Sequence, residues 1–273
     1  MLRKLIFLIF TSIICFYSVS CIGVNNGENI QLLSYSAGPK PLPGSPYSYE
    51  TWDFSGGSAS SNKLTWYGPD QRGGGAFKAE WNGYFLARLG LFWGNGGVYT
   101  QYDNIYIDYD YTRSDNASTH GGFIGMYGWS RNPSAVKDIE KLIEYYVVDD
   151  WFWNEQMGSG HIAGGASNVK EHITITVDGA SYKIYTGERH NQPSIDGTKT
   201  FIQIFSVRQS RRTSGTISVT EHFKEWNKIM ELGSLYEVKF KAESFGGIGY
   251  LDLNYLSLSQ KEPKRVISAN NLD

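Results

Sequence analysis

Two glutamates occupy segments whose other residues favour β-strands. Glu144 lies within residues 142–151, and Glu243 ends residues 236–243. Because side chains alternate along a strand, Glu144 and Tyr146 share one face of the first segment. Two carboxyl groups in one cleft can supply a nucleophile and a general acid. A strand glutamate is more often a solvated residue on an outer face, so the surrounding residues must decide between these interpretations.

Aromatic residues accompany the first glutamate. Phe, Trp and Tyr make up 15% of the chain. Just upstream of Glu144, the side chains of Tyr127, Trp129 and Arg131 share a strand face. The apolar faces of pyranose rings stack on aromatic rings, while polar groups bind the sugar hydroxyls. A face that combines rings with carboxylates is therefore typical of a sugar-binding cleft.

The second glutamate belongs to a segment whose two faces differ. The apolar face, which we expect to point into a core, consists of Tyr236, Val238, Phe240 and Ala242. The other face is charged and consists of Glu237, Lys239, Lys241 and Glu243. This alternation predicts a strand with one buried face.

Similar alternating segments, separated by turns rich in glycine, dominate the chain. Apolar residues and threonines alternate in residues 173–177, just before Asp178–Gly179, a pair that favours a tight hairpin turn. Only one segment has a helical period: it follows Thr220 as a helix N-cap and continues to Leu232. We therefore predict an all-β sandwich with a single α-helix.

The amino terminus has the organisation of a secretory signal. Arg3 and Lys4 precede an apolar run that ends in small residues at 18–20. This run is rather short for a membrane anchor. In chain order we predict a signal peptide at 1–20, a polar, proline-rich lead-in at 21–46, the folded domain at 47–260 and a flexible tail at 261–273.

Composition excludes several classes of function. With 25 basic and 27 acidic residues, the formal charge of −2 excludes a polybasic protein that binds nucleic acid through counterion release. The cysteines, Cys15 and Cys21, both lie near the amino terminus, so the domain has no disulfide, cysteine nucleophile or cysteine-based zinc site. The five histidines lack metal-ligand spacing, and Gly73–Gly75 opens no predicted helix, which excludes a phosphate loop. We therefore expect neither a metal nor a cofactor.

Three runs of sequence together resemble one enzyme family. They are Glu144–Asp149 (EYYVVD), Pro193–Gly197 (PSIDG) and Ser206–Ile217 (SVRQSRRTSGTI). In their order they are similar to glycoside hydrolase family 11, the endo-1,4-β-xylanases, and the resemblance extends from about Tyr47 to Gln260. It implies a β-jelly roll sandwich in which two curved antiparallel sheets form a cleft. The predicted helix would be the single α-helix that packs on the outside of such a fold.

The resemblance also implies a mechanism. Glu144 matches the nucleophile of the family, and Glu243 matches its acid/base in a retaining double displacement. Glu243 would protonate the leaving oxygen while Glu144 attacks the anomeric carbon. Water deprotonated by Glu243 would then release the glycosyl-enzyme. Retention by this route requires carboxyl groups about 5–5.5 Å apart.

Further residues match substrate-binding positions of the family. Trp52 matches a tryptophan that stacks on a sugar, and Pro193–Ile195 match the tip of a thumb loop over the cleft. The full predicted set is Trp52, Tyr127, Trp129, Tyr146, Arg189, Pro193, Ser194, Ile195 and Gln203. Taken singly, Trp52 or Tyr146 would more often be a core residue, and Arg189 would simply pair with a carboxylate.

Departures from the family pattern are also visible. Residues 134–141 form an insertion before the strand of the first glutamate. Phe245 and Ser244 replace a tyrosine and a glycine that follow the acid/base, and Phe205 stands where tryptophan or tyrosine is common. The position that tunes the acid/base aligns near Tyr84, so the family's usual rule for an acidic or neutral optimum cannot be applied.

Lys241 leads to a separate hypothesis. It lies two residues before Glu243 on the same strand face. A cation at this position favours the ionised form of the carboxylate. Because the acid must be protonated to act, we predict that activity falls early on the basic side. The alternative is that Lys241 points into solvent.

Together these features predict a secreted, extracellular endo-1,4-β-xylanase that hydrolyses xylan without a cofactor. We expect a monomer that binds neither nucleic acid nor, after signal cleavage, a membrane. One alternative is an endo-β-1,4-glucanase of related jelly-roll type, which products from xylan and cellulosic glucan would distinguish. The other is a noncatalytic polysaccharide-binding module, which would release no reducing ends.

Overall fold

The structure is a computed structural model that describes residues 30–54, 56–57, 61–114 and 120–260. The predicted signal peptide and the predicted tail lie outside the described residues. Most of the described chain forms β-strands, as the alternation of apolar and polar residues predicts.

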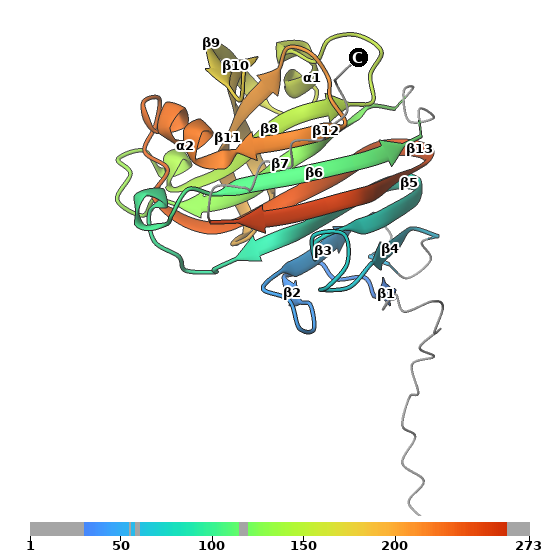
Figure 1. Ribbon diagram of the computed structural model, residues 1–273. Coiled ribbons are helices and arrows are strands. Elements are labelled where there is room, and N and C mark those ends of the chain that lie inside the picture. The colour runs from blue at the N-terminus through green and yellow to red at the C-terminus, as the bar shows by residue number, and fades with distance from the viewer. Residues whose placement is uncertain (1–29, 55, 58–60, 115–119, 261–273) are drawn as a thin grey trace, which may run out of the picture.

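Hydrogen bonds join the strands into one large, bent sheet (Figure 1). In chain order the strands are β1 (Gln31–Leu33), β2 (Lys40–Pro41), β3 (Ser48–Trp52), β4 (Lys63–Trp66), β5 (Phe77–Phe92), β6 (Tyr106–Arg113), β7 (Gly122–Arg131), β8 (Leu142–Trp151), β9 (Ser167–Val177), β10 (Ala180–Ser194), β11 (Gly197–Arg208), β12 (Ser214–Ser218) and β13 (Ser234–Ser259). The main path runs β1-β4-β5-β13-β7-β8-β11-β10-β9, and β2, β3, β6 and β12 attach beside it.

Strand β13 belongs to both layers of the fold. Its first part, Ser234–Ser244, pairs with β7, and its last part, Leu251–Ser259, pairs with β6. Strand β5 pairs with it across both parts. In Figure 1, β6 passes in front of β7 and β8, so the sheet is folded over on itself. The predicted jelly-roll sandwich is confirmed.

Two neighbouring connections, one at a local turn and one between strands distant in sequence, set the order of β8 to β11. Strands β9 and β10 form the predicted hairpin, in which Asp178 and Gly179 have positive φ angles of 51° and 70°. Strand β11 then returns beside β8, and these two strands are parallel. The sandwich is therefore antiparallel except at this pair.

Helix α2 (Val219–Asn227) packs on the main core as the predicted helix. Its apolar face is explained by Phe223 and Trp226, which are fully buried. The helix is shorter than predicted, because it ends before Leu232. Thr220 lies inside the helix rather than at its N-cap.

Three short helical segments were not predicted. They are η1 (Tyr99–Gln101), η2 (Asp138–Lys141) and α1 (Ser159–Ala163). Each has too few residues for a helical period to be recognised in sequence. The segment η2 lies in the insertion at 134–141, directly before β8.

The sheet also begins earlier than predicted. Strands β1 and β2 lie within the lead-in at 21–46 and pair with β4 and β3. Strands of two or three residues are too short to show alternation, and proline is tolerated at the edge of a sheet.

Alternate side chains of β8 point to opposite sides of its layer. Tyr145 and Val147 belong to the main core, together with side chains of β6, β13 and α2. Tyr146 and Val148 belong to a second buried cluster. We call this second cluster the cleft-side cluster; it comprises Phe123, Tyr127, Trp129, Leu142, Tyr146, Val148, Trp151, Met157, Ile162, Tyr185, Phe201, Phe205 and Val207. Glu144, which alternates with the core residues, lies on the side of the cleft-side cluster.

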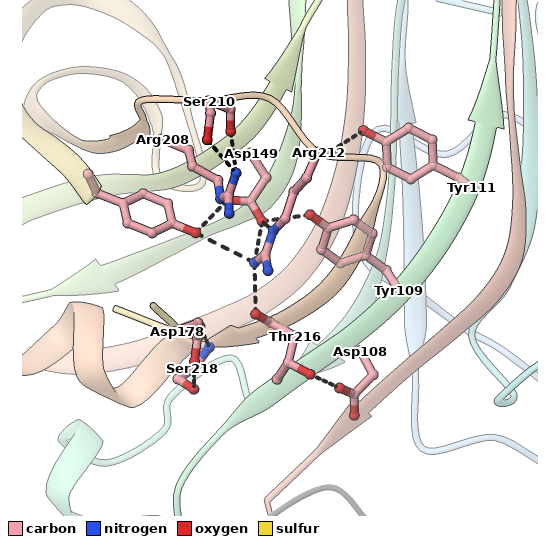
Figure 2. A network of polar contacts seen from close by, with 11 residues as sticks. Asp108, Tyr109, Tyr111, Asp149, Asp178, Arg208, Ser210, Arg212, Thr216 and Ser218 are labelled. Atoms are coloured by element: carbon pink, nitrogen blue, oxygen red, sulfur yellow. Dashed lines mark hydrogen bonds and ion pairs between the residues drawn. The ribbon is translucent and has the colours of Figure 1, made fainter. Parts of the chain in front are cut away.

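A buried polar network attaches β8 to the surrounding elements (Figure 2). Asp149 accepts hydrogen bonds from the hydroxyls of Tyr109 on β6 and Tyr182 on β10, at 2.6 and 2.8 Å. The guanidinium of Arg212 lies 2.7 Å from the same carboxylate and also donates to the backbone oxygen of Thr216 at 2.7 Å. The network holds together strands that are far apart in sequence.

Candidate active site

A cleft of about 800 Å³ opens on the side of the cleft-side cluster. Its walls come from β3, β5, β7, β8, β10, β11, β13, α1 and the turn between β10 and β11. The predicted site residues that line it are Trp52, Tyr127, Trp129, Glu144, Arg189, Pro193, Ser194, Ile195 and Gln203. Tyr146 and Glu243, which are 5% and 8% exposed, are not part of this lining, but each is hydrogen-bonded to a lining residue, Gln203 and Tyr84 respectively. The structure therefore brings the predicted residues together around one cleft.

Glu144 on β8 is held by neutral hydrogen-bond donors. The hydroxyl of Tyr127 donates to Oε1 at 2.7 Å, and the amide nitrogen of Gln203 donates to Oε2 at 2.6 Å. The indole nitrogen of Trp129 donates in turn to the Tyr127 hydroxyl at 2.5 Å. Trp129 and Gln203 lie directly opposite Glu144 on the two neighbouring strands. Both carboxylate oxygens of Glu144 therefore accept a hydrogen bond, which fixes the orientation of the carboxylate.

Glu243 on β13 is held by two donors of different charge. The hydroxyl of Tyr84 on β5 donates to Oε1 at 2.6 Å, and the ammonium of Lys241 donates to Oε2 at 2.5 Å. Burial, followed by the charge of Glu243, raises the pKa of Tyr84 far above its ordinary value. Tyr84 therefore keeps its proton and remains a donor. Tyr84 itself lines the cleft, so Glu243 lies one hydrogen bond away from the cleft lining.

The two glutamates act electrostatically on the same side chains. Burial is the main reason that the pKa values of Tyr84 and Tyr146 are raised, and the charges of Glu144 and Glu243 raise both further. Burial lowers the pKa of Lys241, while the same two carboxylates partly oppose that effect. Both carboxylates therefore belong to one electrostatic environment.

Tyr146 is positioned by packing behind the first glutamate. Its ring stacks on Phe205, with centroids 4.4 Å apart and planes 8° from parallel. The amide nitrogen of Gln203 lies 3.3 Å from its hydroxyl. Phe205, a departure from the family pattern, thus supports a predicted site residue.

The turn between β10 and β11 carries the predicted thumb tip. Residues 193–195 line the cleft, and the adjacent Asp196 pairs with Arg131 on β7 at 2.7 Å. Arg189, on β10, lines the cleft and donates to the Gln192 side chain at 3.3 Å. The ion pair between Asp196 and Arg131 therefore connects the tip of this turn to strand β7.

Four aromatic side chains line the β3 and β5 side of the cleft, and one of them, Tyr84, is largely buried. Trp52 is 39% exposed, as a ring that stacks on a sugar must be. Phe54, Tyr84 and Phe245 also line the cleft, and Tyr84 lies parallel to Phe245, with ring centroids 6.3 Å apart. Sequence reasoning did not include Tyr84 among the site residues, although its alignment with the tuning position was the available signal.

Four charged side chains between β3, β5 and β13 were also missed. Arg88 pairs with Glu50 and, at 3.2 Å, with Glu237. Lys239 pairs with the same two carboxylates, at 2.5 and 3.0 Å. We call these four residues the charged ring. Glu237 and Lys239 were visible as part of a charged strand face, but their partners come from strands distant in sequence.

One residue of β13 faces the opposite way from our prediction. Tyr236 was expected in the core, yet it lines the cleft. The pairing of β13 with β7 shifts register between Leu235 and Glu237. Such a bulge interrupts strict alternation, so a period of two cannot locate Tyr236 correctly.

The described residues contain no group of His, Cys, Asp or Glu that could hold a metal ion. Within the same part of the chain, no helix is both long and apolar enough to cross a membrane. The groups gathered at the cleft are carboxylates, phenol hydroxyls, an amide and cations, which suit binding of hydroxylated ligands and acid–base chemistry.

Comparison with known proteins connects this site to one family. The family described as "Glycosyl hydrolases family 11" matches residues 46–254. The chain is 41% identical over 217 residues to endo-1,4-beta-xylanase S20 of Neocallimastix patriciarum, covering 78% of this chain and 58% of that protein. It is 37% identical over 220 residues to endo-1,4-beta-xylanase C of Fibrobacter succinogenes, covering 80% of this chain and 32% of that protein. The chain thus spans less than two thirds of the length of these relatives.

Solved structures show the same similarity. The wild type of the xylanase ENZbleach matches with a TM-score of 0.76 and 45% identity, over 88% of this chain and 93% of that chain. A mutant of the same xylanase matches with a TM-score of 0.78 and 47% identity, over 87% of each chain. Fold and sequence therefore agree over most of both chains.

Proposed function

The chain belongs to glycosyl hydrolase family 11, and from this membership we propose that it is an endo-1,4-β-xylanase. It would cut internal β-1,4 bonds of xylan by a retaining double displacement, with Glu144 as nucleophile and Glu243 as acid/base. The observation that carries the proposal is that Glu144 on β8 lines the cleft, while Glu243 on β13 is hydrogen-bonded to Tyr84, which lines the same cleft. The relatives named as xylanases support the choice of substrate.

In the first step, Glu144 attacks the anomeric carbon while Glu243 protonates the leaving glycosidic oxygen. The hydrogen bonds from Tyr127 and Gln203 hold the attacking carboxylate in a fixed orientation. Both oxygens of Glu243 accept hydrogen bonds in the free protein. To act as the acid, Glu243 donates a proton from one of these oxygens, so the donor on that oxygen must turn away.

In the second step, Glu243 acts as the base. It deprotonates the water that attacks the glycosyl-enzyme, which restores Glu144. The contacts from Tyr84 and Lys241 favour the ionised Glu243 that this step needs.

Substrate binding in this proposal relies on the remaining cleft residues. Trp52 supplies an exposed ring for stacking, and residues 193–195 cover the sugar chain from the thumb. Arg189 and Gln203 supply polar groups for the sugar hydroxyls. We further propose that the enzyme is secreted, acts outside the cell as a monomer and needs no cofactor; the signal-like residues at 1–20 support secretion.

A reducing-sugar assay on xylan and on cellulosic glucan tests the activity. We expect new reducing ends from xylan, a rapid fall in chain length and first-formed products that keep the β configuration in proton NMR. Faster release from glucan would instead support the endo-β-1,4-glucanase. Binding of either polysaccharide without release, unchanged in Glu144→Gln, would support the noncatalytic module.

A further inference from the structure

A buried lysine lies beside the proposed acid/base. Lys241 sits on β13 between β5 and β7, opposite Arg88 and Gly125. Its ammonium is 2.5 Å from Oε2 of Glu243, and its side chain is 2% exposed. Lys241 therefore does not point into solvent.

Three aromatic rings surround the same ammonium. The centroids of Phe123, Tyr146 and Tyr127 lie 4.2, 4.4 and 4.8 Å from Nζ. At these distances the faces of aromatic rings attract a cation. Tyr127 also donates to Glu144 at 2.7 Å, so this one side chain contacts both the ammonium and the proposed nucleophile.

The other charges near Lys241 are engaged with one another. Arg88 on β5 lowers the pKa of Lys241, but its guanidinium pairs with Glu50 and Glu237. Lys239 pairs with the same two carboxylates, so both cations of the charged ring have carboxylate partners within the ring. Tyr84, Tyr127 and Tyr146 have strongly raised pKa values, mainly through burial, and stay neutral. The carboxylates left to balance Lys241 are Glu243, in contact, and Glu144, beyond the rings.

Building on the proposed function, we infer that Lys241 is a positioning residue whose charge favours the ionised forms of both Glu243 and Glu144. The consequence differs between the two half-reactions. The first step needs a protonated Glu243, which the cation opposes, and an ionised Glu144, which it assists. In the glycosyl-enzyme Glu144 is esterified and uncharged, so Lys241 acts on Glu243 alone and favours the base.

Removal of the Lys241 charge should move both limbs of the activity profile to higher pH. Without Lys241, Glu144 needs a higher pH to ionise and Glu243 keeps its proton to a higher pH. Both limbs of the bell-shaped profile of kcat/KM, which reports the free enzyme, then shift in the same direction. We expect the basic limb to rise by about 1 unit or more and the acidic limb by less, because an opposite charge in contact has the larger effect. At acidic pH the second step slows, so the glycosyl-enzyme should accumulate.

The test compares Lys241→Met with Lys241→Arg and Lys239→Met. The profile of kcat/KM against pH is measured on an aryl xylobioside, and the glycosyl-enzyme is followed by mass spectrometry of acid-quenched samples. Lys241→Arg keeps the charge, so both limbs of its kcat/KM profile should stay at the pH values of the parent. Lys239→Met removes a buried lysine of the same strand face that pairs with Glu50 and Glu237, and should shift the limbs by less than half as much.

Unmoved limbs in Lys241→Met, or equal shifts in both methionine variants, would overturn the inference. Should the methionine variant fail to fold, NMR of the parent labelled with ¹⁵N-lysine provides a second measurement. An ammonium signal for Lys241 throughout the active pH range supports the inference, and a neutral amine in that range contradicts it. A parent that releases no reducing ends from xylan would instead contradict the proposed function.

Discussion

Strand β8 carries three buried carboxylates, and two of them, Glu144 and Asp149, have contrasting surroundings. Asp149 is 1% exposed and is bound by the cation Arg212 and by two phenol hydroxyls (Figure 2). Glu144 is 8% exposed, lines the cleft and accepts hydrogen bonds from a phenol and an amide, both neutral. One carboxylate is closed off by its partners, and the other remains accessible to a ligand.

The difference indicates what each carboxylate can do. A buried carboxylate whose oxygens are occupied by a cation and by hydroxyls is not accessible to a reaction partner, and loss of its cation leaves an uncompensated charge. A carboxylate held by neutral donors at the edge of a cleft can exchange those contacts for a reaction partner. We therefore assign Asp149 to stability and propose chemistry for Glu144, although both lie on the same strand.

The largest effect should come from Glu144→Gln. It keeps the size of the side chain but removes the nucleophile, so we expect xylan hydrolysis to fall by about 10⁴-fold or more, as for other nucleophile removals. The melting temperature should stay close to that of the parent. Residual activity above a hundredth of the parent's in reducing-sugar assays would contradict the proposed role.

Asp149→Asn should have the opposite signature. It leaves Arg212 without its carboxylate, and breaking a buried ion pair costs about 3–5 kcal/mol of unfolding free energy. Urea unfolding at constant pH measures this loss, and activity per folded molecule should remain within about twofold of the parent. A loss of activity as large as that of Glu144→Gln would remove the distinction between the two carboxylates.

His222, on α2, allows a test of how stability depends on pH near Asp149, because its ring contacts Tyr182, which donates to Asp149. Burial, with a smaller contribution from the charge of Arg212, lowers the pKa of His222 from 6.5 to about 3. Because the unfolded chain takes up this proton first, stability is full above about pH 6.5 and is lost as the pH falls toward 3, by about 3 kcal/mol at pH 4. Urea unfolding from pH 7 to 4 should show a flatter loss in His222→Gln. An equally steep loss in the variant would contradict this assignment.

The smallest effect is expected for Asp196→Asn at the thumb tip. Its carboxylate pairs with Arg131 in a partly exposed ion pair, with 37% of the Asp196 side chain exposed. Such pairs contribute about 0–1 kcal/mol to stability. We expect a change in unfolding free energy within this range and, since the tip is less well anchored, a modest rise in KM with kcat retained. A stability loss as large as that of Asp149→Asn would show that the exposure of a carboxylate does not determine how much its ion pair contributes to stability.

Much of the local structure could be predicted from patterns of residue types. Alternation identified the strands of both glutamates, and Asp178–Gly179 identified a hairpin. The exceptions have local causes: β1 and β2 are too short to show a pattern, and the bulge beside Leu235 reverses the side of Tyr236. Each exception arises where pairing with another strand decides the conformation.

The site could be predicted only in part for the same reason. Motifs identified Glu144, Tyr127 and Gln203 as one group, and the structure shows them hydrogen-bonded. No motif linked Tyr84 to Glu243, because the contact joins residues 159 positions apart.

By itself, the sequence determined the alternation that assigns each strand residue to a face, the single long helix and the family to which the chain belongs. The tertiary structure alone decided which strands are neighbours, and hence that Lys241 is buried against Glu243 while Lys239 is bound in the charged ring. The physical reason is that alternation fixes the side of a strand to which a residue points, whereas its partners depend on non-local pairing and burial.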